Sequence, residues 1–165
     1  MNTKTILAGV VVLLAVGGLF FWGRANQADS SGVSLGKESA LRATETLHDF
    51  STISMKNGNV EKTFEIMNPT DGDITLASLT TSCMCTTAFI VTDGTRRGPF
   101  GMPGHGGPVP RANEVVPAGG KLGVAVVYDP NAHGPAGVGP IDRFIYLLDD
   151  AGGELELEIK ANVTP

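Results

Sequence analysis

Two residues, Cys83 and Cys85, are the first candidates for chemistry, because they are the only cysteines in the chain and lie two positions apart. In an extended strand, residues two apart project their side chains from the same face, so the two sulfur atoms would be neighbours. Three interpretations are open. The pair could bind a soft metal as thiolates, it could form a disulfide, or both residues could be small apolar core residues.

The disulfide interpretation has a geometric consequence. Strand residues two apart lie about 6.6 Å from each other, close to the upper limit of about 6.8 Å between the Cα atoms of a disulfide. Such a bond would be strained and easily reduced, which suits a redox role better than a structural one. The parity of the neighbouring residues does not decide whether the cysteines are buried, since Leu79 and Phe89 favour an inward orientation and Met84 and Ile90 favour the opposite.

Met102, His105 and His133 are further candidate metal ligands. The first two lie in a glycine- and proline-rich stretch, and His133 lies in a second glycine-rich loop, residues 131–140. Two thiolates with one or two imidazoles would form a tetrahedral zinc set, whereas two thiolates with a thioether and one imidazole would favour copper as Cu(I). The alternative is that Met102 and His105 are solvated loop residues. The metal hypothesis requires their loop to fold back over the cysteines.

Motifs for enzyme catalysis are missing from the sequence. It has no nucleophilic serine in a Gly-x-Ser-x-Gly context, no phosphate-binding lysine loop and no clustered pair of carboxylates. His48 beside Asp49 is interpreted as a residue at the beginning of a strand. We therefore expect a protein that is not an enzyme.

Short β-strands are the elements that would position these residues. The last segment alternates between apolar and charged residues, and the strand over 121–129 is apolar at both parities, which predicts a central strand covered on both faces. Asn57-Gly58 predicts a hairpin between the first two strands. No helical period competes after residue 45. The pattern indicates an all-β fold, an antiparallel β-sandwich, with strands over 49–55, 60–68, 74–81, 121–129, 141–149 and from 155 onward.

The stretch over residues 93–112 interrupts this rhythm with six glycines and four prolines. Proline has no N–H donor for an interior strand, so we expect this insert to be a loop. Loops longer than about 12–15 residues within a compact domain are usually functional or disordered.

The beginning of the chain predicts a membrane segment. Residues 5–22 are an uncharged apolar run between Lys4 and Arg24, and a helix of that length spans about 27 Å of a bilayer core of about 30 Å. We expect residues 1–24 to form a single-pass anchor in the cell membrane, with a cleaved signal peptide and a secreted product as the alternative. Residues 25–44 would form a flexible linker and residues 45–165 an extracytoplasmic domain, periplasmic or extracellular.

Charge restricts the partners. The chain has 12 basic and 17 acidic residues and a net charge of −5, which argues against a nucleic-acid partner. Its 42% hydrophobic residues are enough for one real core, and two cysteines exclude a disulfide-dense scaffold.

Several motifs, in this order, resemble a bacterial extracytoplasmic family catalogued as domain of unknown function 1573. They are Asp49-Phe50, Phe64-x-Ile66-x-Asn68, Thr81-Ser82-Cys83-Met84-Cys85-Thr86, Pro117-Ala118-Gly119 and Tyr128-Asp129-Pro130, within residues 45–165. The resemblance implies an immunoglobulin-like sandwich and export, and it implies no activity. The chain differs from the family at Ser51 and Met84, where glycine is usual, and in its long insert.

These observations together predict an immunoglobulin-like binding module, tethered to the membrane by its N-terminal helix. Its favoured ligand is a soft metal ion, copper before zinc, held by Cys83, Cys85, Met102 and His105, with His133 as a possible substitute. The alternatives are a scaffold domain that docks on another envelope protein without metal, and a thiol–disulfide redox module.

Overall fold

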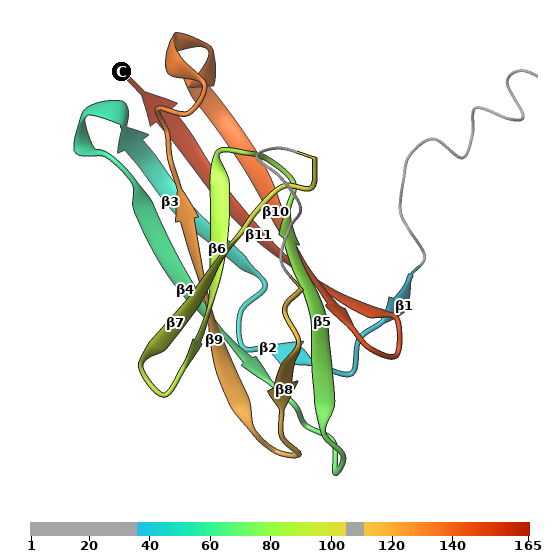
Figure 1. Ribbon diagram of the computed structural model, residues 1–165. Helices are drawn as coiled ribbons and strands as arrows, with labels where there is room; N and C mark the ends of the chain where they lie inside the picture. The colour runs from blue at the N-terminus through green and yellow to red at the C-terminus, as the bar shows by residue number, and fades with distance from the viewer. Residues whose placement is uncertain (1–35, 105–110) are drawn as a thin grey trace, which may run out of the picture. The chain divides into compact units, whose positions relative to one another are not determined.

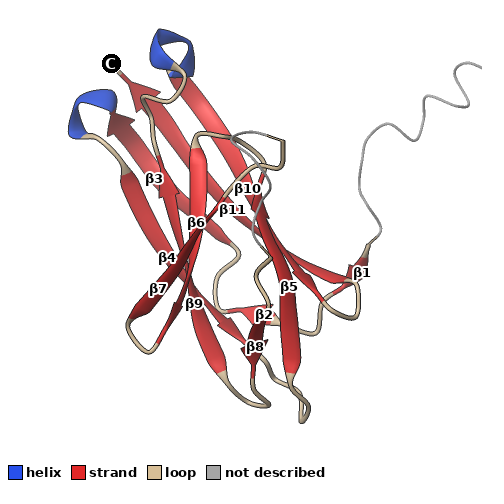
Figure 2. Cartoon of the chain, in the orientation of Figure 1, coloured by secondary structure: helices blue, strands red, loops and turns tan. Residues whose placement is uncertain are grey.

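The computed structural model describes residues 36–104 and 111–165, which form two β-sheets around one hydrophobic core (Figures 1 and 2). This confirms the all-β, two-sheet fold expected from the sequence. The first sheet has the strand order β1 (Lys37–Glu38), β11 (Gly153–Thr164), β10 (Gly139–Asp149), β5 (Ile74–Thr81) and β8 (Glu114–Val116), and β3 (Leu47–Ser54) also pairs with β11. The second sheet has the order β2 (Arg42–Ala43), β4 (Val60–Met67), β9 (Lys121–Tyr128), β6 (Thr86–Thr92) and β7 (Thr95–Phe100).

The core residues follow the predicted alternation along the last strand. In β11, Leu157, Ile159 and Val163 are at most 1% exposed, whereas Glu156, just before Leu157, is exposed. In the second sheet, β9 lies between β4 and β6, and Ala125 is as buried as its apolar neighbours of the opposite parity. The prediction of a central strand is confirmed, but its outer face is fully buried only at Ala125, since Gly123 and Val127 of the same parity are half-buried.

Strand pairing is not antiparallel throughout, so this part of the prediction is wrong. β11 pairs antiparallel with β10, but on its other edge it pairs parallel with both β1 and β3. Glu158 lies opposite Leu47, and Val163 lies opposite Ile53. β3 and β11 are far apart in the sequence, so no hairpin turn fixes their relative direction, and the long intervening chain can act as the crossover that parallel pairing requires.

The turn at Asn57-Gly58 does not form the predicted hairpin. β3 belongs to the first sheet and β4 to the second, and the chain passes between them through a 3₁₀ turn, η1 (Met55–Asn57). The Oγ atom of Ser54 accepts a hydrogen bond from the Lys56 amide at 3.2 Å and caps this turn. Gly58 has a φ of +76°, so the glycine does supply the turn conformation expected of it. It turns the chain toward a new partner sheet, not back along β3.

Ordered structure begins earlier than expected. Strands β1 and β2 lie within residues 25–44, and Leu41 is fully buried. The predicted linker is therefore too long at its C-terminal end. Its sequence is small and polar, and only the tertiary contacts described below show why the segment from residue 36 is held in place.

The predicted loop over 93–112 contains a strand. Residues 93–94 form a turn after β6, and β7 then pairs antiparallel with β6. β7 is the last strand of its sheet, so Pro99 leaves no neighbouring strand without a hydrogen-bond donor. The prediction excluded an interior strand correctly but overlooked an edge strand.

Helical structure in the described part of the chain amounts to two short 3₁₀ turns, η1 and η2 (Gly134–Gly137). Figure 2 shows both at the end of the sandwich where the C terminus lies. Neither is long enough to cross a membrane. The predicted membrane helix, residues 1–24, lies outside the described residues.

Candidate functional site

The cysteines lie in a tight turn between β5 and β6, not in an extended strand as the sequence analysis assumed. The Thr86 amide donates to the Cys83 carbonyl at 3.1 Å and closes this turn. The Thr81 hydroxyl, which is buried, lies within hydrogen-bond distance of two carbonyls of the turn, those of Cys83 (3.1 Å) and Thr86 (2.9 Å). Local polar groups therefore fold the turn.

The turn is also attached to both sheets. The Ser82 amide donates to the Phe144 carbonyl of β10 at 2.9 Å, and the Phe144 amide donates to the Ser82 hydroxyl at 2.9 Å. On the other side, the Asp129 amide just after β9 donates to the Cys85 carbonyl at 2.9 Å. Since these bonds hold the backbone on both sides, the two sulfur atoms occupy a defined position.

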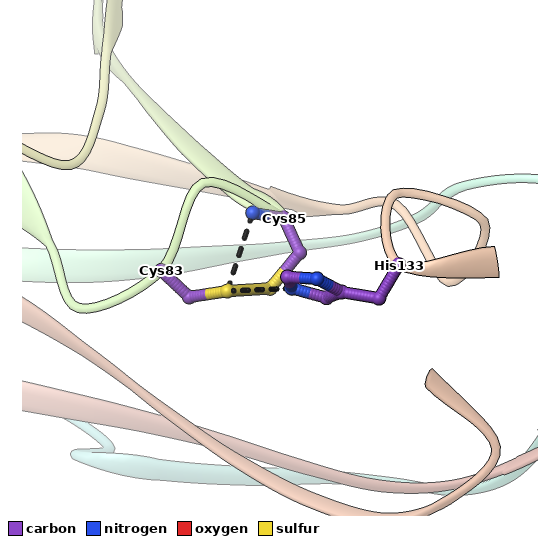
Figure 3. A group of neighbouring side chains, drawn as sticks. All are labelled: Cys83, Cys85 and His133. Atoms are coloured by element: carbon purple, nitrogen blue, oxygen red, sulfur yellow. Dashed lines mark hydrogen bonds between the residues drawn. A yellow bond between two sulfur atoms is a disulfide. The ribbon is translucent and has the colours of Figure 1, made fainter. Parts of the chain in front are cut away.

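Cys83 and Cys85 form a disulfide, with their Cα atoms 5.3 Å apart (Figure 3). Of the three interpretations that the sequence left open, this is the one present in the structure. The turn brings the Cα atoms closer than an extended strand would, so the separation lies within the ordinary range for disulfides. The expectation that the bond would lie near the upper limit of that range is wrong.

The two sulfurs have different surroundings. Cys85 is 2% exposed and belongs to the core cluster, and its Sγ atom accepts a hydrogen bond from Nε of Arg143 at 3.1 Å. Cys83 is half-buried, and its Sγ atom lies 3.2 Å from Nε2 of the exposed His133. A neutral donor, the Cys85 amide, also lies 3.3 Å from the Cys83 sulfur.

Arg143 is a residue of the candidate site that the sequence analysis missed. It lies on β10 at the same parity as Ile141 and Ile145, which are buried. A guanidinium at an inward-facing strand position must find a polar partner, and that is the signal by which the sequence could have revealed it. In the described part of the chain Arg143 forms no salt bridge with a carboxylate, so its charge faces the sulfur without a neutralising partner.

The charge of Arg143 also affects the pKa of Tyr128 at the end of β9. Burial raises the pKa of Tyr128, and the nearby Arg143 guanidinium opposes part of that rise while Asp129 adds to it. Tyr128 is 1% exposed. The buried end of the site therefore has one charge of each sign nearby, the Arg143 guanidinium and the Asp129 carboxylate.

His133 comes to the site from a distant part of the chain. It lies in the connection between β9 and η2, where the Gly134 amide donates to the Asn131 carbonyl at 2.9 Å. Figure 3 shows its ring facing the disulfide from this connection. The two Sγ atoms and one ring nitrogen of His133 all lie within 4.8 Å of one another.

The structure does not bring the other two predicted ligands, Met102 and His105, to this group within the residues that it describes. Met102 is half-buried in the turn after β7. The Gly101 carbonyl accepts a hydrogen bond from the Thr81 amide at 3.3 Å, which places the start of that turn beside the end of β5. Within the described residues, however, no hydrogen bond joins Met102 to Cys83, Cys85 or His133. His105 lies outside the described residues, and its role stays a prediction.

Comparison with solved structures supports the fold. A protein of unknown function from Porphyromonas gingivalis W83 is similar, with a TM-score of 0.55 and 15% sequence identity over 81% of this chain and 51% of that one. The ASH/PapD-like domain 7 of human CEP192 has a TM-score of 0.46 and 12% identity, covering 77% and 87% of the two chains. At such low identity the first similarity establishes the fold alone. The present chain spans about half the length of the Porphyromonas protein.

No curated protein matches the sequence significantly. The family comparison gives a more specific result. Residues 41–99, which include the whole Cys83–Cys85 turn, match the family described as "Protein of unknown function (DUF1573)", and this match confirms the family resemblance inferred from the motifs.

Proposed function

We propose that this domain is a thiol–disulfide redox module whose working group is the Cys83–Cys85 pair. The observation that carries the proposal is the arrangement around the disulfide. Arg143 contacts one sulfur at 3.1 Å, and the His133 imidazole lies 3.2 Å from the other. A purely structural bond would need neither group.

The size of the loop that the disulfide closes favours a redox role. The cysteines are two positions apart, and the chain-entropy argument assigns a loop of three residues only about 1.6 kcal/mol, compared with about 4.7 kcal/mol for a loop of 100 residues. The Thr81 hydroxyl and the backbone bonds of Ser82 already hold the same turn. The covalent bond therefore contributes little to stability.

The charges support reduction of the bond. Reduction adds two electrons and two protons and produces two thiols, and any thiolate at Cys85 would accept a charge-assisted hydrogen bond from Arg143. A cation next to a sulfur stabilises the thiolate relative to the disulfide, which makes the disulfide the stronger oxidant. His133 offers a proton donor or acceptor beside Cys83.

A location outside the cytoplasm belongs to the same proposal. Residues 1–24 would anchor the protein in the membrane, and a disulfide persists in oxidising compartments beyond the cytoplasm. The partner would be an envelope protein with reactive thiols. The module would exchange electrons with that partner and would not act as an enzyme on a small molecule.

Equilibration of the purified domain in glutathione redox buffers tests the proposal. Alkylation and mass spectrometry should reveal one reversible two-electron couple with a potential above about −300 mV, the level below which structural disulfides fall. Circular dichroism should remain that of the folded domain throughout the titration. A bond that opens only when the domain unfolds would overturn the redox function.

A second candidate function, binding of Cu(I) by the reduced pair, is favoured by the group of three ligand atoms within 4.8 Å. Two thiolates and one imidazole suit a soft ion. The charges of two thiolates, the Arg143 guanidinium and one Cu(I) ion also sum to zero. Met102 and His105 remain proposed additional ligands, and Zn(II) is the competing ion.

Metal titration separates this candidate from the first. The reduced domain should take up one equivalent of Cu(I) tightly, and both the oxidised domain and a Cys83→Ser/Cys85→Ser variant should not. Equal copper content in the variant and the reduced wild type would exclude this site. If the redox titration were negative as well, the docking domain for an envelope complex would be favoured instead.

A further inference from the structure

We infer that the two sulfurs have fixed and different roles in exchange: an external thiolate attacks Sγ of Cys83, and Cys85 departs as a thiolate bound to Arg143. The inference rests on the redox function proposed above and assigns the order of events at that site. Its substrate is an external dithiol.

Access to the sulfurs supplies the first argument. Thiol–disulfide exchange requires a thiolate to reach the sulfur that it attacks. Cys85 is 2% exposed, whereas Cys83 is half-buried and is followed by Met84, which is 53% exposed. His133, whose ring lies against the Cys83 sulfur, is also exposed. An incoming thiolate can therefore approach Cys83 and not Cys85.

The choice of leaving group supplies the second argument. Nε of Arg143 lies 3.1 Å from Sγ of Cys85, and a hydrogen bond from a cation to a thiolate is stronger than one from a neutral donor. Among the described residues, the partners within hydrogen-bond distance of the Cys83 sulfur are the neutral Cys85 amide and the His133 imidazole. Exchange is faster when the departing sulfur is the better stabilised anion. Accessibility and charge thus assign the same roles.

The complete reaction is balanced in two steps. In the first, the substrate thiolate forms a bond to Sγ of Cys83, the Cys83–Cys85 bond breaks, and its electron pair stays on Cys85. In the second, the other substrate thiolate attacks its own sulfur in this mixed disulfide, and Cys83 departs. The products are a substrate disulfide and a protein dithiol, so two electrons have moved from the substrate to the domain. Cys83 departs beside Nε2 of His133, which can donate the proton that the new thiolate takes up.

Single cysteine variants provide the first test. In Cys85→Ser the remaining Cys83 thiol should form a stable mixed disulfide with oxidised glutathione, which peptide mapping by mass spectrometry detects. In Cys83→Ser the buried Cys85 should react at least about tenfold more slowly. During reduction of the wild type by glutathione, the acid-trapped intermediate should carry glutathione on Cys83.

The role of Arg143 has its own test. Arg143→Met should slow reduction of the wild-type disulfide by glutathione about tenfold, because a hydrogen bond to a charged group is lost, and Arg143→Lys should restore most of the rate. Arg97→Met is the matched control and should not affect the rate, since Arg97 lies on the edge strand β7 and pairs with Glu114 of β8. If Arg143→Met does not fold, the wild-type mapping decides alone.

Two negative results have different meanings. Glutathione on Cys85, or equally on both cysteines, would overturn the assigned roles while the redox function stood. A folded domain that glutathione and dithiothreitol cannot reduce would overturn the redox function itself, and the assignment with it.

Discussion

The hydroxyl of Ser39 donates a 2.6 Å hydrogen bond to Oδ2 of Asp149, across 110 positions of the chain. The two residues are 1% and 5% exposed. The other carboxylate oxygen of Asp149 accepts a 2.6 Å bond from the Gly153 amide. One buried carboxylate therefore closes the turn between β10 and β11 and also holds the segment between β1 and β2. Its burial is tolerated because each oxygen has a donor.

Replacing Ser39 by alanine should lower the free energy of unfolding by about 1–3 kcal/mol, because Oδ2 of the buried Asp149 would lose its donor. Urea denaturation measures the change. Ser78→Ala is the control, since the Ser78 side chain makes no hydrogen bond within the described residues, and it should stay within about 0.5 kcal/mol of the wild type. Equal effects of the two substitutions would show that the Ser39 contact contributes no net stability.

Gly153→Ala should disturb the same region through sterics. A Cβ atom at this position would lie 2.6 Å from both Cα of Ser39 and Oδ2 of Asp149. Backbone cannot shift cheaply, so we expect a loss of about 1–3 kcal/mol and faster hydrogen exchange at the Leu41 amide, which now donates to the Ser39 hydroxyl. Gly72→Ala meets open space and should leave that amide protected. Unchanged exchange in Gly153→Ala would contradict the close packing.

Two adjacent leucines on β10 test the two faces of the first sheet. Leu147 is fully buried and Leu148 is 37% exposed. Leu147→Ala should cost about 2–5 kcal/mol because it leaves a cavity between the sheets, and Leu148→Ala should cost less than about 1 kcal/mol. Chemical denaturation of the two variants gives both values. Similar losses would mean that the face assignment is wrong.

The acidic row on β11 gives a pH-dependent prediction. Desolvation raises the pKa of Glu156 above its ordinary value of 4.5, and the charges of Glu154 and Glu158 raise it further. The folded state then holds the proton more tightly than the unfolded chain. The stabilisation is fully present below pH 4.5 and is lost as the pH rises through the folded-state pKa.

At neutral pH the charge of Glu156 destabilises the folded state, so Glu156→Gln should raise Tm. The gain in the free energy of unfolding should be only about a few tenths of a kcal/mol, because the residue is exposed. The advantage should disappear near pH 4. Thermal denaturation of both proteins at the two pH values checks the sign. A lower Tm for Glu156→Gln at neutral pH would contradict the raised pKa.

The sequence predicted those parts of the fold that depend on local pattern. The alternation from Leu155 to Val163 and the doubly apolar strand around Ala125 define their own faces, and both are present in the structure. The parallel pairing of β3 with β11 could not be predicted in this way, because strand direction depends on topology and not on the residues of either strand. The link between Ser39 and Asp149 was missed for a similar reason, since neither residue signals its partner.

The candidate site was predictable only in part. Cys83 and Cys85 are evident from their spacing, but Thr81 and Ser82 use their hydroxyls to form a turn where an extended strand was assumed. His133 was considered only as a substitute ligand, and nothing in its sequence context indicates that η2 places it against a sulfur. Arg143 carried a usable signal, since a charged residue at an inward-facing strand position needs a partner.

The last strand, β11, completes the first sheet for three other strands, because β1, β3 and β10 all pair with it. The ribosome synthesises the N-terminal end first, so the residues of β1 and β3 are made long before those of β11, their common partner. The domain can therefore reach its native state only after nearly all of its residues have been synthesised. A nonsense mutation anywhere upstream of β11 would therefore release a product without a complete first sheet.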